Sequence, residues 1–429
     1  MERVILHSDA NCFYASVESV YRPELRRVPM AVCGDPEARH GIVLTKNYLA
    51  KKYGLSTGEA IWQAKQKCPN LVVVPPNFPL YMEYSRRLRK LYEEYTDRVE
   101  AFGLDESWLD ISQPSFTIAD GERLANEIRR RVRKELEITV SVGVSFNKVF
   151  AKLGSDMKKP DGTTVIRRDN FRKIVWPLAA RDLLYVGPKT ERKLREMGIY
   201  TIGDLARANT DVLSGRLGKN GRMLQSYALG LDLTPVSPST ADVAAKSISN
   251  STTLPRDLNC LDDARCVLYL LAESVGARLR KLGLRAGCVS VFARDTTLHT
   301  DSCQRSLSAS TNITGEIARA SVALFVERLA YMLPLRSVGI GLSGLESANA
   351  PVQLDMFGQY QHRMREERLD QTLDVLNARY GRRVVRRGIV FAEQDFCRIQ
   401  PSEKSLMNPF AHAGQGNSPE HSRKATDLS

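Results

Sequence analysis

The chain has 429 residues, and 43% of them are hydrophobic, which is enough for the cores of about two to four domains and excludes a mainly disordered protein. Its 62 Lys and Arg residues exceed its 49 Asp and Glu residues and give a net charge of +13. Basic residues spread over most of the chain predict an extended contact with nucleic acid, although a basic protein without such a partner also fits the charge.

No apolar run approaches the roughly 18 residues of a membrane-spanning helix, so we expect a soluble protein with no membrane partner. The eight cysteines include no C-x-x-C pair, which argues against a structural zinc site. With no signal peptide in the sequence, we expect reduced thiols in a cytoplasm.

The N-terminal segment predicts a strand that leads directly into a helix. Apolar residues at 4–8 form the strand and Asp9 follows it, while Phe13, Val17 and Val20 recur at helical spacing. Asp9 therefore stands at the junction of the two elements.

The next region brings two hydroxyl groups and an ammonium group together. A short strand at 30–33 precedes the segment 41–48, and a helix is expected through Lys51 to residue 54. Thr45, Tyr48 and Lys51 would lie close together and could bind a triphosphate. Without further context, ordinary polar surface positions explain these residues better than a binding site does.

An adjacent acidic pair, Asp105 and Glu106, lies within an apolar segment. The elements predicted around it are a strand at 71–74, a long polar helix at 80–99, an amphipathic helix at 124–136 and a half-buried strand at 138–145. They predict an α+β sheet with helices on one face, compatible with a ferredoxin-like arrangement.

Asp9 and the acidic pair stand where apolar strands end. A carboxylate in such a place is costly unless it is paired, protonated or bound to a cation. Side by side, the strand ends would form the oxygen site that Mg²⁺ prefers, and three carboxylates could hold two ions roughly 3.5–4 Å apart. The alternative is that each acid is a turn residue or a helix cap.

Two basic features follow the acids. A short basic helix begins at Asn147 and ends at Lys158 and Lys159, and one of these two lysines could reach substrate phosphates as a point charge. Residues 171–233 predict a separate helical block, in which a glycine-bearing hairpin could contact a phosphate without reading base sequence. Its candidate DNA-binding residues are Gly187, Lys189 and Thr190; an ordinary αα-hairpin is the alternative.

The remaining chain predicts a linker, a further domain and a tail. In order, these are a linker at 234–242, a domain at 243–345 with strands at 288–292 and 337–342 and helices at 262–283 and 314–332, a charged helix at 360–380, and a polar segment from about 401 that we expect to be disordered.

Taken together, these motifs resemble the Y-family, translesion-type DNA polymerases, most closely their bacterial DNA polymerase IV branch. The resemblance covers about residues 3–345 and continues to the peptide Gln353–Phe357. It rests on Asp9 with Phe13 and Tyr14, on the segments 45–48, 145–152 and 158–162, and on Asp105 with Glu106.

The resemblance implies a multidomain α+β fold shaped as a right hand. Its parts would be a ferredoxin-like palm at 1–10 and 76–170, small fingers at 11–75, a helical thumb with a helix-hairpin-helix at 171–233, the linker at 234–242, an α/β little finger at 243–345 and a C-terminal tail at 346–429.

The resemblance also implies residue roles. Asp9 and Asp105 would hold two Mg²⁺ ions with help from the Ala10 carbonyl, and Glu106 would ligate the catalytic ion. Tyr14, supported by Phe13, would be the steric gate that excludes a 2′-hydroxyl. The triphosphate would be held by Thr45, Tyr48 and Lys159.

Two positions depart from the family pattern. Lys51 stands where many relatives have arginine, so it keeps the charge for a phosphate but loses the bidentate fork. Asn11 replaces a carboxylate often found two residues after the first metal ligand, at a position that the two-ion scheme does not require.

The resemblance thus implies a low-fidelity, damage-tolerant DNA polymerase that adds dNTPs to primer-template DNA and releases pyrophosphate, and we expect it to act as a monomer in a bacterial cytoplasm. The tail motif would bind the replication sliding clamp through Gln353, Leu354, Met356 and Phe357, unless these side chains dock on the last domain or on the helix at 360–380. The competing classes are a catalytically inactive DNA- or clamp-binding protein and another two-metal palm enzyme such as a nucleotide cyclase.

Overall fold

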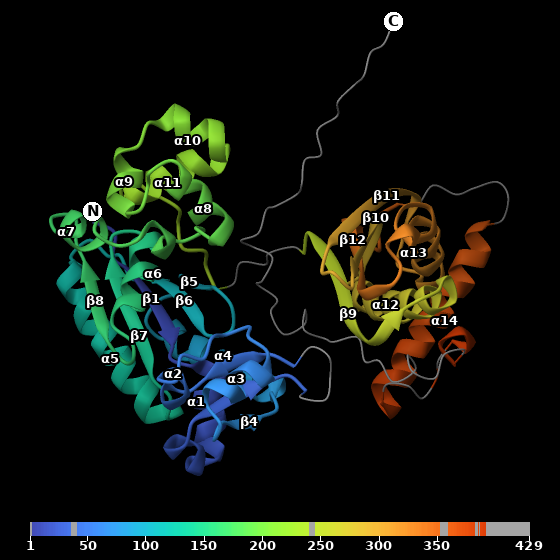
Figure 1. The fold of residues 1–429 in the computed structure, drawn as a ribbon, viewed down its shortest axis with the longest axis horizontal. Helices are drawn as coiled ribbons and strands as arrows, with labels where there is room; N and C mark the ends of the chain where they lie inside the picture. The colour runs from blue at the N-terminus through green and yellow to red at the C-terminus, as the bar shows by residue number, and fades with distance from the viewer. Residues whose placement is uncertain are drawn as a thin grey trace, which may run out of the picture. The chain divides into compact units, whose positions relative to one another are not determined.

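The computed structural model describes residues 2–35, 41–239, 245–351, 359–381, 385 and 387–391. These residues form two compact units, the first before residue 243 and the second from residue 243 on (Figure 1). The tail peptide Gln353–Phe357 and the segment from residue 401 lie outside the described residues. Among the residues that are described, no helix is both long and apolar enough to cross a membrane.

A five-stranded sheet forms the centre of the first unit, in the order β5-β6-β1-β7-β8. Its strands are β1 (Ile5–Ala10), β5 (Val99–Ala101), β6 (Glu106–Asp110), β7 (Val140–Ser145) and β8 (Thr163–Ile166). The helices around it are α1 (Phe13–Tyr21), α4 (Phe78–Glu93), α5 (Ile118–Leu136) and α6 (Lys148–Met157). Strand β1 is central in the sheet and is buried along its whole length, including its polar residues His7, Ser8 and Asp9.

Helices cover both faces of this sheet, so the prediction of helices on one face is wrong. Leu6 of β1 shares a core with Ile128 and Val132 of α5. On the opposite face Gly143 of β7 lies so close to α6 that a Cβ atom there would come within 1.8 Å of the Ala151 carbonyl oxygen. The alternation of a strand sends successive side chains to these two covers.

The long helix predicted at 80–99 is also wrong at its end. Helix α4 stops at Glu93, and Val99 instead begins the edge strand β5, where it pairs with Leu109 of β6. Val99 is buried in the core below the sheet. Strand pairing and burial therefore override the helical reading of the polar residues before it.

A small three-stranded sheet, in the order β3-β2-β4, follows α1. Its elements are the 3-10 helix η1 (Pro23–Arg27), β2 (Met30–Cys33), β3 (Val43–Lys46), α2 (Tyr48–Lys51), α3 (Ile61–Lys67) and β4 (Val72–Val74). Helix α2 has a single turn, capped by the Asn47 side chain, which accepts a hydrogen bond from the Ala50 amide at 2.9 Å. It ends at Lys51, earlier than the predicted end at residue 54.

The predicted helical block has a core of its own. It contains α7 (Phe171–Val175), η2 (Ala180–Asp182), α8 (Pro188–Glu196), α9 (Ile202–Arg207), α10 (Thr210–Leu217) and α11 (Lys219–Ala228). The block's core also takes in Phe146 and Phe150, which come from β7's end and α6. The block therefore packs on α6 of the first unit.

The second unit has a four-stranded antiparallel sheet in the order β11-β10-β12-β9. Its elements are β9 (Ser247–Leu258), α12 (Leu261–Lys281), β10 (Leu284–Asp295), β11 (Thr300–Thr311), α13 (Thr314–Arg328), η3 (Ala330–Met332), β12 (Leu335–Ser347), α14 (Gln359–Tyr380) and η4 (Gly388–Phe391). Strands β9 and β11 were not predicted from the sequence, because only four of the twelve residues of β9 and one of the twelve residues of β11 are buried.

Helix α14 is fixed to the second unit by charged groups. Asp370 is 2% exposed and accepts a hydrogen bond of 2.7 Å from the Thr314 amide, so it caps the N-terminus of α13, whose own N-cap residue, Ile313, has no side-chain bond. Arg280 of α12 and Arg387 also contact this carboxylate.

We expect Asp370→Asn to lower the stability of the second unit by about 2 kcal/mol, because Arg280 would keep its charge in a buried site with less to balance it. Thermal unfolding of the full chain would measure this loss. Asp262→Asn is the matched control, since Asp262 is exposed in the first turn of α12. Equal melting of both variants would contradict the assignment.

Candidate active site

The fold brings the three predicted acids together. Strands β1 and β6 are antiparallel with Asp9 opposite Glu106, so one strand's C-terminal end meets the other's N-terminal end. Asp105 directly precedes β6, and its carbonyl oxygen accepts a hydrogen bond of 3.0 Å from the Ala10 amide. Carboxylates almost 100 residues apart in sequence therefore share one edge of the sheet.

Burial and mutual repulsion raise the pKa values of two carboxyl groups in this cluster. Burial, followed by the charge on Glu106, raises the pKa of Asp9 to about 6, although Lys159 opposes the shift. Burial also raises the pKa of Asp105 to about 7, and the charges on Asp9 and Glu106 add to it. A cation placed between these carboxyl groups would be favoured, because it would stabilise their ionised forms.

Two lysines reach into the cluster from α6 and its end. Lys159 Nζ lies 2.7 Å from Asp9 Oδ2 and 2.8 Å from Asp156 Oδ1. Lys152 forms an ion pair with Glu106. Within the described part of the chain, no group of three or more His, Cys, Asp or Glu side chains converges as metal ligands do. Each of the two ammonium groups thus contacts one carboxylate oxygen of the cluster.

The sequence analysis missed a buried histidine behind Glu106. His7 is fully buried in β1, its Nε2 lies 3.2 Å from Glu106 Oε2, and its Nδ1 lies 2.8 Å from the Ser155 hydroxyl. Burial lowers the pKa of His7 to about 4, so the ring is neutral at physiological pH. Burial would raise the pKa of Glu106, but His7 and Lys152 outweigh it and hold that pKa near 2. The available signal was spacing, because residues 7 and 9 of a strand share one face.

Tyr14 lies in an aromatic cluster beside the acids. Its ring stacks on Tyr81 of α4, with 4.3 Å between centroids and 12° between planes. Phe78 meets it edge-on at 6.0 Å, and Phe13 packs at 5.7 Å. One face of the Tyr14 ring is thus covered by protein. The sequence analysis named Phe13 but missed Phe78 and Tyr81.

The three candidate triphosphate ligands of the small sheet occupy neighbouring places. Thr45 lies in β3, and Tyr48 and Lys51 lie at the two ends of the single turn of α2. The Tyr48 hydroxyl donates to Asn11 Oδ1 at 3.3 Å, which links this turn to the residue two positions after Asp9. Lys51 is exposed and its ammonium group lies 5.6 Å from the centre of the Tyr48 ring.

Gly187, Lys189 and Thr190 lie apart from the acids, at the start of α8. Gly187 is the N-cap residue, and Lys189 and Thr190 belong to the first turn. Gly187 and Lys189 are exposed. The start of α8 therefore presents backbone amides and the Lys189 ammonium group at the surface.

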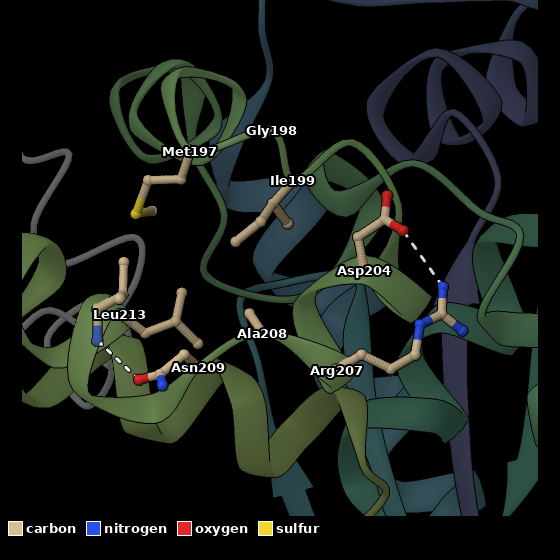
Figure 2. Close-up of a pocket in the computed structure, with 9 residues that line it drawn as sticks. Met197, Gly198, Ile199, Asp204, Arg207, Ala208, Asn209 and Leu213 are labelled. Carbon is tan, nitrogen blue, oxygen red and sulfur yellow. Dashed lines mark hydrogen bonds and ion pairs between the residues drawn. The ribbon is translucent and has the colours of Figure 1, made fainter.

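A cavity of about 300 Å³ lies in the same helical block (Figure 2). Met197, Ile199 and Leu213 give it an apolar lining. Its charged residues, Asp204 and Arg207, are paired at 3.3 Å. The cavity holds no nucleophile or carboxylate cluster, so the acidic strand ends are the better candidate for the active site.

The sequence and the fold match known proteins. Residues 8–156 match the model of the impB/mucB/samB family, and residues 245–356 match that of the impB/mucB/samB family C-terminal domain. DNA polymerase IV of Acetivibrio thermocellus is 48% identical over 399 residues, covering 93% of this chain and 100% of that protein. DNA polymerase IV 1 of Bacillus subtilis is 36% identical, covering 92% and 94%.

The fold is also similar to those of solved DNA polymerase structures. A Y-family DNA polymerase chimera, Dbh-Dpo4(243-245)-Dbh, superposes with a TM-score of 0.71 at 26% identity, over 80% of this chain and 98% of the chimera. An insertion ternary complex of Dbh DNA polymerase has a TM-score of 0.57 at 26% identity, over 79% and 98%.

Proposed function

The chain belongs to the impB/mucB/samB family and is a translesion-type, DNA-directed DNA polymerase of the Y family, and we propose that it extends primers by a two-metal mechanism. In this reaction the primer 3′-hydroxyl attacks the α-phosphorus of a dNTP and pyrophosphate leaves. The observation that carries the proposal is the convergence of Asp9, Asp105 and Glu106 at one sheet edge. The three clustered acids speak against an inactive binding protein, which would not need them, and the family match over both units speaks against a cyclase.

The residues present fit two Mg²⁺ ions. Asp9 and Asp105 would hold both ions with the Ala10 carbonyl, and Glu106 would ligate the catalytic one. Oxygen donors and raised carboxyl pKa values support this set, since a divalent cation stabilises the ionised forms. The bound ions would neutralise charge on the attacking and leaving oxygens.

Metal binding is expected to depend on pH. Protons compete with the cation for Asp9 and Asp105, whose pKa values are raised to about 6 and about 7. Without metal, these ordinarily acidic groups favour the folded state at low pH, and this contribution is lost as pH rises through 6 to 7. We therefore expect Mg²⁺ to raise the melting temperature little at pH 5.5 and clearly more at pH 8. An equal rise at both values would contradict the assignment.

The substrate residues follow from their places around the acids. Tyr14 would exclude ribonucleotides by lying under the sugar, with Phe13 supporting it. Thr45, Tyr48 and Lys51 would bind the triphosphate. Lys159, which pairs with Asp9, would bind a substrate phosphate as a point charge.

The DNA would be held by the remaining parts of the hand. We assign the palm to 1–10 and 76–170, the fingers to 11–75, the thumb to 171–233 and the little finger to 243–345. Gly187, Lys189 and Thr190 would contact phosphates through the amides and charge at the start of α8. We propose that the enzyme acts as a monomer in the bacterial cytoplasm.

Low fidelity and damage tolerance are part of the proposal. The fingers have only a three-stranded sheet and short helices, so few bulky groups would press on the new base pair. Primer extension with Mg²⁺ on matched undamaged and lesion-bearing templates tests this. No extension on the undamaged template would refute the polymerase activity, whereas full arrest at every lesion would refute only damage tolerance.

The tail peptide is proposed to bind the replication sliding clamp. Leu354 and Phe357 would fill apolar pockets on the clamp, while Gln353 would supply a directional hydrogen bond and Met356 further apolar contact. Leu354→Ala with Phe357→Ala should leave extension without the clamp unchanged and remove clamp-stimulated processivity, because tethering raises local concentration without altering chemistry. Equal stimulation of the variant and the wild type would refute the idea.

A further inference from the structure

A row of side chains on α1 connects Tyr14 to a buried carboxylate. Tyr14, Glu18 and Arg22 follow each other at intervals of four, so they lie along one side of the helix. Glu18 is 5% exposed and forms an ion pair with Arg22. The helix that carries the proposed steric gate thus also carries a fixed, buried acceptor one turn away.

Tyr81 of α4 spans the first two members of this row. Its ring lies almost parallel to the Tyr14 ring, with 4.3 Å between centroids and 12° between planes. Its hydroxyl donates to Glu18 Oε1 at 2.6 Å. Tyr81 has no exposed surface, and Phe78 and Phe13 each meet its ring from the side. The stack and the hydrogen bond, together with the two flanking rings, hold the Tyr81 side chain in place.

We infer that Tyr81 and Glu18 are positioning residues that set the depth of Tyr14 and thereby the choice between deoxyribose and ribose. The inference rests on the proposed role of Tyr14 as the steric gate. To exclude a single hydroxyl group, the Tyr14 ring under the sugar must not shift by even an ångström. Tyr14 is only half-buried, so its resistance must come from the densely packed ring behind it.

The hydrogen bond to Glu18 fixes the orientation of the Tyr81 ring behind Tyr14. A stacked phenylalanine would fill the same space, but it could slide along the Tyr14 ring because offset stacking has no single preferred register. The charged acceptor fixes the far end of the Tyr81 ring, and its own place is set by Arg22. Tyr14 and Glu18 share one helix, so the three groups move as one body.

The test measures single-nucleotide incorporation of matched dNTP and rNTP by the full chain on one primer-template. Tyr81→Leu should raise the rNTP/dNTP efficiency ratio by about tenfold or more, because a Tyr14 ring displaced by about 1 Å alters reactivity on that scale. Tyr81→Phe should raise it less. Glu18→Ala should raise the ratio, and Glu18→Gln should restore it because the amide oxygen still accepts the hydroxyl. Incorporation of dNTP should stay within about threefold throughout.

Tyr84→Leu is the matched control. Tyr84 is a buried tyrosine one turn further along α4, and its ring meets Tyr21 at 6.2 Å instead of Tyr14. Its substitution removes similar core volume without touching the gate, so the ratio should not change. Melting curves identify any variant that fails to fold, and Tyr81→Phe and Glu18→Gln keep the test available in that case.

The double variant Tyr14→Ala/Tyr81→Leu separates the possible results. If Tyr81 acts through Tyr14, the double variant is no less selective than Tyr14→Ala alone. An unchanged ratio in Tyr14→Ala overturns the gate itself, and this inference with it. If Tyr14→Ala raises the rNTP/dNTP ratio while the Tyr81 and Glu18 variants leave it unchanged, only the inference is overturned. Equal loss of dNTP and rNTP incorporation in Tyr81→Leu would show a purely structural role and also overturn it.

Discussion

Asp105→Ala is expected to reduce primer extension by roughly 10³-fold or more, the scale of removing one preorganised electrostatic stabiliser. The reason is its place beside Asp9 and Glu106, where it would hold both metal ions. Affinity for primer-template DNA should stay close to wild type, because the carboxylate would contact metal and not DNA. Extension kinetics and binding by fluorescence anisotropy measure the two effects separately.

A second substitution and a control sharpen this experiment. Asp105→Asn keeps the shape of the side chain and removes the charge, so it should lose as much activity. It should not lower the melting temperature at pH 8 without metal, because the raised pKa of about 7 shows that the ionised form is unfavourable in the fold. Asp97→Ala removes an exposed acid eight residues earlier and should leave extension intact. Activity of Asp105→Ala within tenfold of wild type would disprove the metal-ligand assignment.

The second large effect is expected for Tyr14→Ala in sugar selection. Loss of the ring should raise ribonucleotide use relative to deoxyribonucleotide use by about 10²-fold, since only contacts with a single hydroxyl group change. Incorporation of dNTP should fall far less, because the acids and the triphosphate ligands stay in place. Competition between each matched rNTP and dNTP on one template measures the ratio.

Tyr21→Ala is the control for this substitution. Tyr21 lies on the same helix, is 57% exposed and contacts Tyr84. Its loss should leave the sugar ratio unchanged. If Tyr14→Ala also left the ratio unchanged, Tyr14 would be a packing residue of the aromatic cluster only.

The sequence by itself determined much of the local structure. The helix at 124–136 follows from apolar residues at steps of four, and the structure confirms it as α5, with a start at Ile118. The short strand at 30–33 and the charged helix at 360–380 are confirmed as β2 and α14. The sequence also singled out Asp9, Asp105 and Glu106, because acids beside buried strands are costly without a partner. The motifs led to the family, which the comparisons show.

Only the tertiary structure decided which groups meet. The pairing of Asp9 with Glu106 depends on strand register, and register is set by long-range pairing that local patterns do not encode. His7 behind Glu106 and Tyr81 behind Tyr14 were missed for the same reason, since each contact joins segments that are far apart in sequence. The predicted helix ran on to Val99, the first residue of β5, because the edge pairing that forms this short strand is with a distant segment. Local composition fixed the chemistry available to this chain, and packing decided which of those groups share a site.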